Sequence, residues 1–294
     1  MEPIVVSACL LSLFIKRIND QESELVNIIL KNTNSITSIF ENNKNLKDAV
    51  NLWCNPKTRT HCEFLYGHIS NWCVSKITDM SYLFQRQRHF DDDISGWDTS
   101  NVITMEGMFM SAHIFNQPLC SWNTSKVITM ESMFKYIDRF NQPIGDWDTS
   151  QVINMSKMFY CSSMFNQNLN YWDVSSVETM KEMFYCASRF NKPLNHWNVS
   201  EVLDMSHMFY NAHKFNCPLG NWNVFKVELM DYMFCCAFNF NQSINNWNVA
   251  KVTNMKAMFY NAKTFNQPIN YWNISNNTNI NNMFYGAVNM KYIF

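Results

Sequence analysis

Residues 172–196 read WDVSSVETMKEMFYCASRFNKPLNH, and the same pattern recurs along most of the chain. Tryptophans recur every 25 residues through nine copies, with no insertion or deletion, at 72, 97, 122, 147, 172, 197, 222, 247 and 272. With the tryptophan counted as position 1, position 13 is Phe in all nine copies and position 19 is Phe in eight. An unbroken period of this length is typical of proteins that stack one small structural unit per repeat.

Each repeat contains two apolar spacings. Within 180–187, apolar residues occur at i, i+3, i+4 and i+7, which predicts a short helix. Trp197 and Val199 alternate with polar residues, which predicts a short strand. Because such a unit cannot bury its apolar face alone, we expect a right-handed α/β repeat solenoid. Its strands would pair into a parallel sheet on the concave side, with helices on the other side.

The combined motif F-N-Q-P-[IL]-x-x-W-[DN]-[VT]-S-x-V-x-x-M-x-x-M-F resembles the BspA-like repeat of mycoplasma surface proteins, which is also frequent in large DNA viruses. The resemblance covers about residues 62–294. It implies a leucine-rich-repeat-like stack of strand–helix coils, usually with no assigned enzymatic activity. In this chain the asparagine row stands at position 20, from Asn116 to Asn266, and not at the usual slot of leucine-rich repeats.

The composition excludes several classes of protein. The 294 residues are 47% hydrophobic and carry a net charge of −1, so global disorder and electrostatic attraction to nucleic acid are not expected. No apolar run approaches the ~18 residues of a membrane-spanning helix. Positions 9 and 12 hold most of the 20 methionines, so methionine richness follows from the repeat and does not indicate a metal site.

The N-terminal residues 1–61 do not follow the period, and we expect them to form a helical cap on the solenoid of residues 62–294. Ile4–Ile15 is an uncharged run that predicts a capping helix, with a signal-peptide core as the alternative. Leu46, Val50 and Trp53 have helical spacing. Residues 62–71 resemble a degenerate leading half-coil, and the ninth repeat is degenerate because it is rich in Asn, with Asn277 where Val is expected.

The ten cysteines do not suggest a disulfide framework. They include no C-x-x-C pair, and neighbouring helices ~8–10 Å apart would keep Cys161, Cys186 and Cys236 unpaired. We therefore expect reduced thiols and an intracellular protein, in the cytoplasm or, for a viral protein, the host cytoplasm or virion. We expect ordinary cap residues at Cys54, His61 and Cys62, with a zinc site as the alternative. We expect a turn at Asp91–Asp93, with a calcium site as the alternative. We assign no catalytic, cofactor-binding or metal-binding residue.

The remaining functional feature is the surface beside the tryptophan row. Outward positions 25, 2 and 4 are mostly small and polar, but Tyr171, His196, Phe225 and Tyr271 interrupt them. Exposed aromatic residues are plausible anchors for a protein partner. The sequence thus predicts a monomeric, non-enzymatic protein-binding scaffold or adaptor whose partner is unknown. The alternatives are a surface adhesin or virion/host-interaction protein and, more remotely, an enzyme with an unrecognised site in the N-terminal cap.

Overall fold

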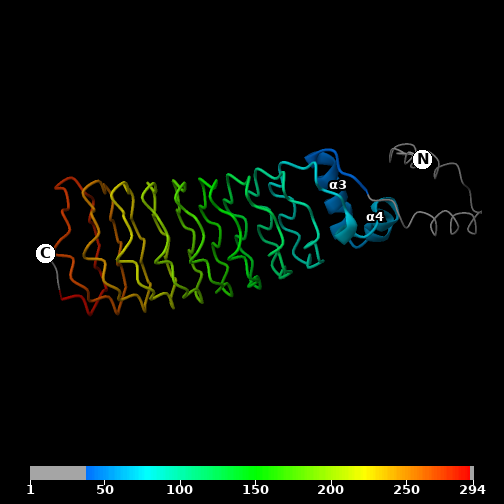
Figure 1. Cartoon of the computed structure of the whole chain (residues 1–294). Helices are drawn as coiled ribbons and strands as arrows, with labels where there is room; N and C mark the ends of the chain where they lie inside the picture. The colour runs from blue at the N-terminus through cyan, green and yellow to red at the C-terminus, as the bar shows by residue number, and fades with distance from the viewer. Residues whose placement is uncertain (1–37, 292–294) are drawn as a thin grey trace, which may run out of the picture.

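The computed structural model describes residues 38–291, so the capping helix expected at Ile4–Ile15 lies outside the described residues. Two helices, α3 (Asn43–Cys54) and α4 (Arg59–Tyr66), and the short 3-10 helix η1 (Ile69–Asn71) precede a long stack of coils (Figure 1). The coils run from Trp72 to the end of the described chain and form an elongated body with the helical cap at one end.

Helix α3 confirms the helical spacing around Trp53. The side chain of Asn42 accepts a hydrogen bond from the Asn45 amide at 2.9 Å and so caps the first turn. Leu46, Ala49, Val50 and Trp53 form its buried face. Helix α4 packs against α3 and extends the cap to Tyr66, so the boundary expected at residue 61 falls inside a helix.

Each 25-residue unit forms one coil, and we number these coils from coil 1, which begins at Trp72, to coil 9, which begins at Trp272. Eight parallel bridges connect position 8 of each coil with position 8 of the next, from Asp79–Thr104 to Asn254–Asn279. A further parallel bridge, Ile39–Cys73, joins the start of coil 1 to the segment before α3. Within residues 38–291 these are isolated bridges, and no extended strand forms.

The short helix expected in each repeat does not form. In coil 5, Glu182 and Cys186 have φ values of 57° and 54°, in the left-handed region. Met183 donates to the carbonyl of Met180 at 3.1 Å and closes one tight turn, while the amides of Glu182 and Cys186 donate to carbonyls of coil 6. Two consecutive tight turns, each with one residue in the left-handed region, therefore replace the helix. They bury the same apolar positions but direct every second amide to the neighbouring coil.

The strand expected beside the tryptophan differs in a similar way. Trp197 and Val199 are buried and Asn198 is exposed, as the alternation predicts. The parallel bridge of this coil, however, falls at Asp204. The tryptophan is held by its side chain instead, because the Trp197 indole N–H donates to the carbonyl of Leu169 in an earlier coil at 2.8 Å. The equivalent bond recurs from Trp97 to Trp272.

Columns of aromatic rings fill the core of the stack. The position-13 Phe rings from Phe84 to Phe284 repeat with centroid distances of 5.4 to 5.7 Å and nearly parallel planes. Position-19 Phe rings form a second column against the first, for example Phe190 at 4.1 Å from Phe184. All nine repeat tryptophans are at most 7% exposed, so their indole rings belong to the core.

Asparagines at position 20 form a ladder along the stack. The Asn141 side-chain oxygen accepts the amide of Asn166 at 2.8 Å, and Asn166 accepts the amide of Asn191 at 2.9 Å. The ladder continues as far as Lys291, whose amide donates to Asn266. Since side chains here satisfy backbone amides that no regular sheet pairs, the asparagine row has a structural role in coils 2 to 8.

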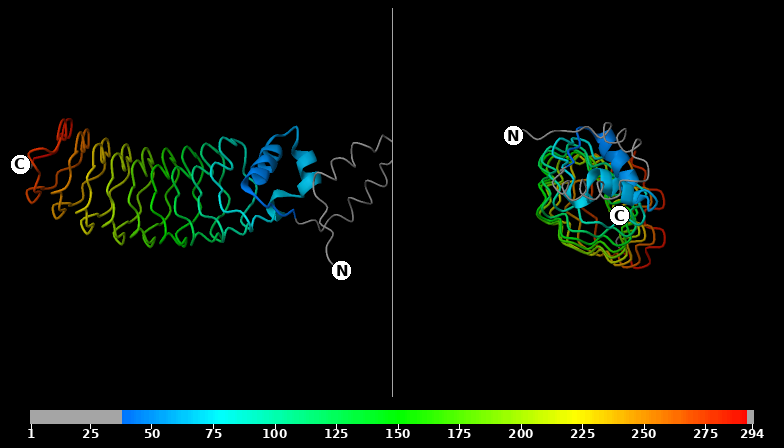
Figure 2. Two further views of the ribbon diagram at one scale, coloured as in Figure 1. Left: turned by 90° about the horizontal axis from the view of Figure 1, so that it is seen from above. Right: turned by 90° about the vertical axis from the view of Figure 1, so that its right-hand side faces the viewer.

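The overall shape follows from these coil-to-coil contacts. A strand–helix coil would be wider on its helical side and would bend the stack around a concave sheet. Because turns replace the helices, hydrogen bonds or stacked side chains set the spacing between neighbouring coils on both sides of the stack. Figure 2 shows an elongated stack with a gentle bend. We therefore name surfaces by repeat position and not as concave or convex.

Candidate protein-binding surface

The four residues predicted to bind a partner are all exposed. Tyr171, His196 and Tyr271 occupy position 25, just before a buried tryptophan, and Phe225 occupies position 4. Tyr171 and Tyr271 are 75% and 72% exposed, which is unusual for such large side chains. The alternation of burial around the tryptophan therefore places these aromatic groups outward, as the sequence predicts.

Tyr171 and His196 form one local pair. Their ring centroids lie 5.3 Å apart on neighbouring coils. The buried Asn170 fixes the histidine, because its side-chain oxygen accepts the His196 amide at 3.2 Å and its nitrogen lies 3.3 Å from His196 Nδ1. An exposed aromatic pair held by a buried amide is preorganised, so a partner would lose less entropy in ordering it.

The other two aromatic residues lie apart from this pair. Phe225 lies in coil 7, with the Lys251 ammonium 4.6 Å from the centre of its ring. Tyr271 ends coil 8, and its amide donates to the side chain of Asn245 at 3.1 Å. The structure thus brings Tyr171 and His196 together but does not unite all four predicted residues in one patch.

A row of exposed isoleucines was missed by the sequence analysis. Ile103, Ile128 and Ile153 occupy position 7 of coils 2, 3 and 4 and are 42 to 44% exposed. Their backbones are hydrogen-bonded in series, with Ile128 donating to Ile103 and Ile153 donating to Ile128, both at 2.9 Å. We call these three residues the isoleucine row. Position 7 varies along the chain, and only its persistence as isoleucine over three consecutive coils could have signalled this surface.

A shallow groove of about 580 Å³ follows this row. Its lining comprises Ile103, Ile128 and polar residues of positions 2, 4 and 5, including Lys126, Asp148 and Ser150. An apolar stripe beside polar groups of both signs has the composition expected of a protein-binding groove. The groove lies on coils 2 to 4, and the Tyr171–His196 pair lies at the ends of coils 4 and 5.

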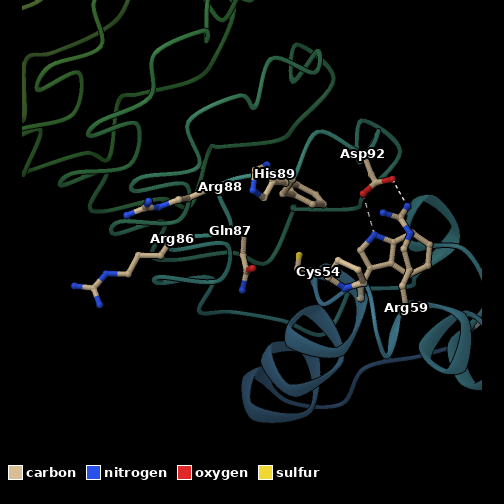
Figure 3. A pocket seen from close by; sticks show the side chains of 10 residues that line it. Cys54, Arg59, Arg86, Gln87, Arg88, His89 and Asp92 are labelled. Atoms are coloured by element: carbon tan, nitrogen blue, oxygen red, sulfur yellow. Dashed lines mark hydrogen bonds and ion pairs between the residues drawn. The ribbon is translucent and has the colours of Figure 1, made fainter.

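A second hollow, of about 370 Å³, lies where the cap meets coil 1 (Figure 3). Asp92 accepts the Trp53 indole N–H at 3.0 Å and forms an ion pair with Arg59, whose guanidinium lies 4.2 Å from the centre of the Trp53 ring. Arg86 and Arg88 point away from Cys54 in this view. Asp92 therefore joins the cap to the stack, and does not simply lie in a solvated turn.

The chemistry of this hollow does not favour nucleophilic catalysis. Burial, reinforced by the Asp92 carboxylate, raises the pKa of Cys54 to about 12. Burial also raises the pKa of Cys62 to about 11. Because the thiolate is the reactive form, neither cysteine is activated at neutral pH. Within residues 38–291, no three His, Cys, Asp or Glu side chains are grouped so as to hold a metal ion.

Comparison with known proteins identifies the family. The family described as "Mycoplasma protein of unknown function, DUF285" matches residues 54–161, 137–235 and 194–293. These overlapping matches cover nearly all of the coils, and the chain belongs to this repeat family, as its resemblance to the mycoplasma-type repeat predicts. No curated protein and no solved structure matches the chain. No helix in the described part of the chain is long and apolar enough to cross a bilayer.

Proposed function

We propose that this member of a family of unknown function is a non-enzymatic scaffold, a repeat solenoid that binds a protein partner. The binding surface would comprise the isoleucine row and the Tyr171–His196 pair. The observation that carries the proposal is the exposure of Ile103, Ile128 and Ile153 in consecutive coils, with a groove that Ile103 and Ile128 line. Apolar surface gathered in one place on an otherwise polar exterior marks an interaction site more often than scattered apolar residues do.

The contrast with the same position in other coils supports this assignment. Position 7 is Thr78 in coil 1, Glu178 in coil 5 and Thr253 in coil 8, so the coil itself does not need isoleucine there. Each isoleucine leaves apolar surface in water, which a partner would remove at roughly 25 cal/mol per Å². A partner with an apolar ridge flanked by polar groups would complement the groove.

The repeat supplies variants that test the surface without disturbing the coil. Ile103, Ile128 and Ile153 can be changed together to Thr, the residue of coils 1 and 8. Tyr171 can be changed to Asn, because Asn221 occupies the same position in coil 6. We expect each variant to weaken binding by about 1–3 kcal/mol. The partner would first be identified by cross-linking to the wild-type chain in its native source, and its affinity then measured by calorimetry.

A matched control lies on another side of the coil. Tyr136, at position 15, is 40% exposed, and Ser111 occupies the same position in coil 2. The change Tyr136→Ser should leave affinity for the partner unchanged. Equal affinity of all variants for the identified partner would refute the proposed surface. Glycans or a cleaved N-terminus on the native protein would instead favour the surface-adhesin alternative over an intracellular adaptor.

A further inference from the structure

Two cysteines lie one above the other on neighbouring coils. Cys161 and Cys186 occupy position 15 of coils 4 and 5, and the Cys161 amide donates to the carbonyl of Tyr185 at 2.7 Å. The adjacent rings of Tyr160 and Tyr185 are stacked 4.4 Å apart. The helices ~8–10 Å apart that seemed to exclude a bond between these cysteines are absent. Backbones joined by such a bond lie ~4.8 Å apart, within the Cα separation of roughly 4.4–6.8 Å that disulfides require.

The two thiols also affect each other's ionisation. The neighbouring Cys161 thiol lowers the pKa of Cys186, and Cys186 raises the pKa of Cys161. On its other side, the Asn211 amide donates to the Cys186 sulfur at 3.5 Å. Both cysteines are partly exposed, so small reagents can reach them. Cys186 thus has the donors that stabilise a thiolate, with a second thiol beside it.

We propose that Cys161 and Cys186 are a redox modification site, at which a low-molecular-weight disulfide such as oxidised glutathione closes a reversible disulfide between coils 4 and 5. The Cys186 thiolate attacks one sulfur of glutathione disulfide and releases a glutathione thiolate, which leaves a mixed disulfide on Cys186. Cys161 then loses its proton to solvent and attacks the Cys186 sulfur, releasing the second glutathione. Two protein thiols are oxidised, and one glutathione disulfide is reduced to two thiols.

The bond would be reversible for a geometric reason. Cys161 and Cys186 are equivalent positions of stacked coils, so their side chains leave the backbone in the same direction and do not face each other. A disulfide between them needs a small shift of one coil, and strained, accessible disulfides are the ones that are readily reduced. The cross-link would tie together the coils that end in Tyr171 and His196.

Other cysteines in the described part of the chain lack this arrangement. Cys236 is also at position 15, but Asn211 and Asn261 occupy that position on the neighbouring coils. Its sulfur lies 3.8 Å from that of Cys235, the next residue in the chain. Cys54 and Cys62 have raised pKa values because they are buried. Cys236 is therefore the matched control for a half-exposed thiol at the same position without an inter-coil partner.

The test uses the full-length chain, reduced and then equilibrated with defined ratios of oxidised to reduced glutathione. Free thiols are alkylated, and disulfides are mapped by peptide mass spectrometry. We expect the Cys161–Cys186 disulfide to form before any other modification and to disappear when reduced glutathione is added. Cys161→Ser should leave a lasting glutathione adduct on Cys186, whereas Cys186→Ser should leave Cys161 free. Serine is compatible with this position because Ser111 occupies it in coil 2.

Three results would overturn the proposal. The first is a folded chain in which Cys161 and Cys186 stay unpaired while other thiols are oxidised. The second is modification of Cys236 at the same rate and to the same extent as Cys186. The third is Cys161→Ser protein that acquires no adduct at Cys186. Circular dichroism on each sample verifies that the chain remains folded during the exchange.

Discussion

Replacing Trp172 tests how strongly one coil depends on its tryptophan. The indole is 2% exposed, its N–H donates to the Ile144 carbonyl at 2.9 Å, and it lies nearly parallel to Trp147 at 6.4 Å. Trp172→Ala removes the ring and leaves a cavity between coils. It also leaves the Ile144 carbonyl without its side-chain donor. Both effects act on the folded state.

The magnitude follows from these contacts. A buried large aromatic residue changed to alanine costs about 3–5 kcal/mol in transfer and cavity terms. Loss of the indole hydrogen bond adds roughly 1 kcal/mol, although the Ile144 carbonyl keeps the Trp147 amide as a donor at 3.3 Å. The adjacent Tyr171 is 75% exposed, so Tyr171→Ala should change the free energy of unfolding by no more than about 0.5 kcal/mol. Two consecutive residues are thus expected to differ by several kcal/mol.

Urea denaturation followed by circular dichroism measures both variants without relying on tryptophan fluorescence. Stacked repeats can unfold in parts, so amide hydrogen exchange should accompany it and localise the loss to coils 4 and 5. The interpretation fails if Trp172→Ala costs no more than Tyr171→Ala. It also fails if the loss of protection is spread evenly over all nine coils.

The asparagine ladder and His207 yield two more predictions. Asn166→Ala removes the acceptor of the Asn191 amide and should lower the free energy of unfolding by about 1 kcal/mol in urea titrations, and no loss would contradict a structural ladder. Burial lowers the pKa of His207, with the Asp231 carboxylate opposing it, so folding disfavours the protonated form. The stability that neutral His207 contributes is lost as pH falls through its unfolded pKa of about 6.5. Between pH ~7.5 and ~5.5 the wild type should therefore lose more stability than His207→Asn, and parallel losses would contradict this.

The period in the sequence was sufficient to predict what is buried. Tryptophan and phenylalanine columns follow from residues repeated every 25 positions, because equivalent positions of stacked units must adjoin. The apolar face of α3 follows from Leu46, Val50 and Trp53 in the same way. These predictions depend only on which side chains avoid water, so they hold for any backbone that brings equivalent positions together.

The backbone path could not be predicted in this way. Two consecutive tight turns bury the same residues of 180–187 as one short helix would, so the spacing cannot distinguish them. Left-handed conformations are usually signalled by Gly or Asn, yet here Glu182 and Cys186 adopt them. The inter-coil bonds that stabilise them become visible only in the structure. Because helices were expected in each repeat, Cys161 and Cys186 were also expected to lie on helices ~8–10 Å apart.

The proposed surface was only partly predictable. Tyr171 and Tyr271 could be placed outward because they adjoin a tryptophan of known burial. The isoleucine row follows the buried Val102, Val127 and Val152 directly in sequence, so both residues of each pair look like core. The backbone turns between positions 4 and 7, and only this turn directs the valine into the core and the isoleucine to solvent.

A pair of glycine substitutions tests the left-handed turns most directly. Glu182 has a φ of 57°, and Gly107 occupies the same position of coil 2 with a φ of 55°. A non-glycine residue in this left-handed conformation costs ~1–2 kcal/mol of strain. Relief of that strain by Glu182→Gly offsets the entropy cost of introducing a glycine. Urea denaturation should therefore show Glu182→Gly within about 0.5 kcal/mol of the wild type or above it, while Lys181→Gly loses about 1 kcal/mol. If both variants instead lose about 1 kcal/mol, as in a helix, the coil described here is contradicted.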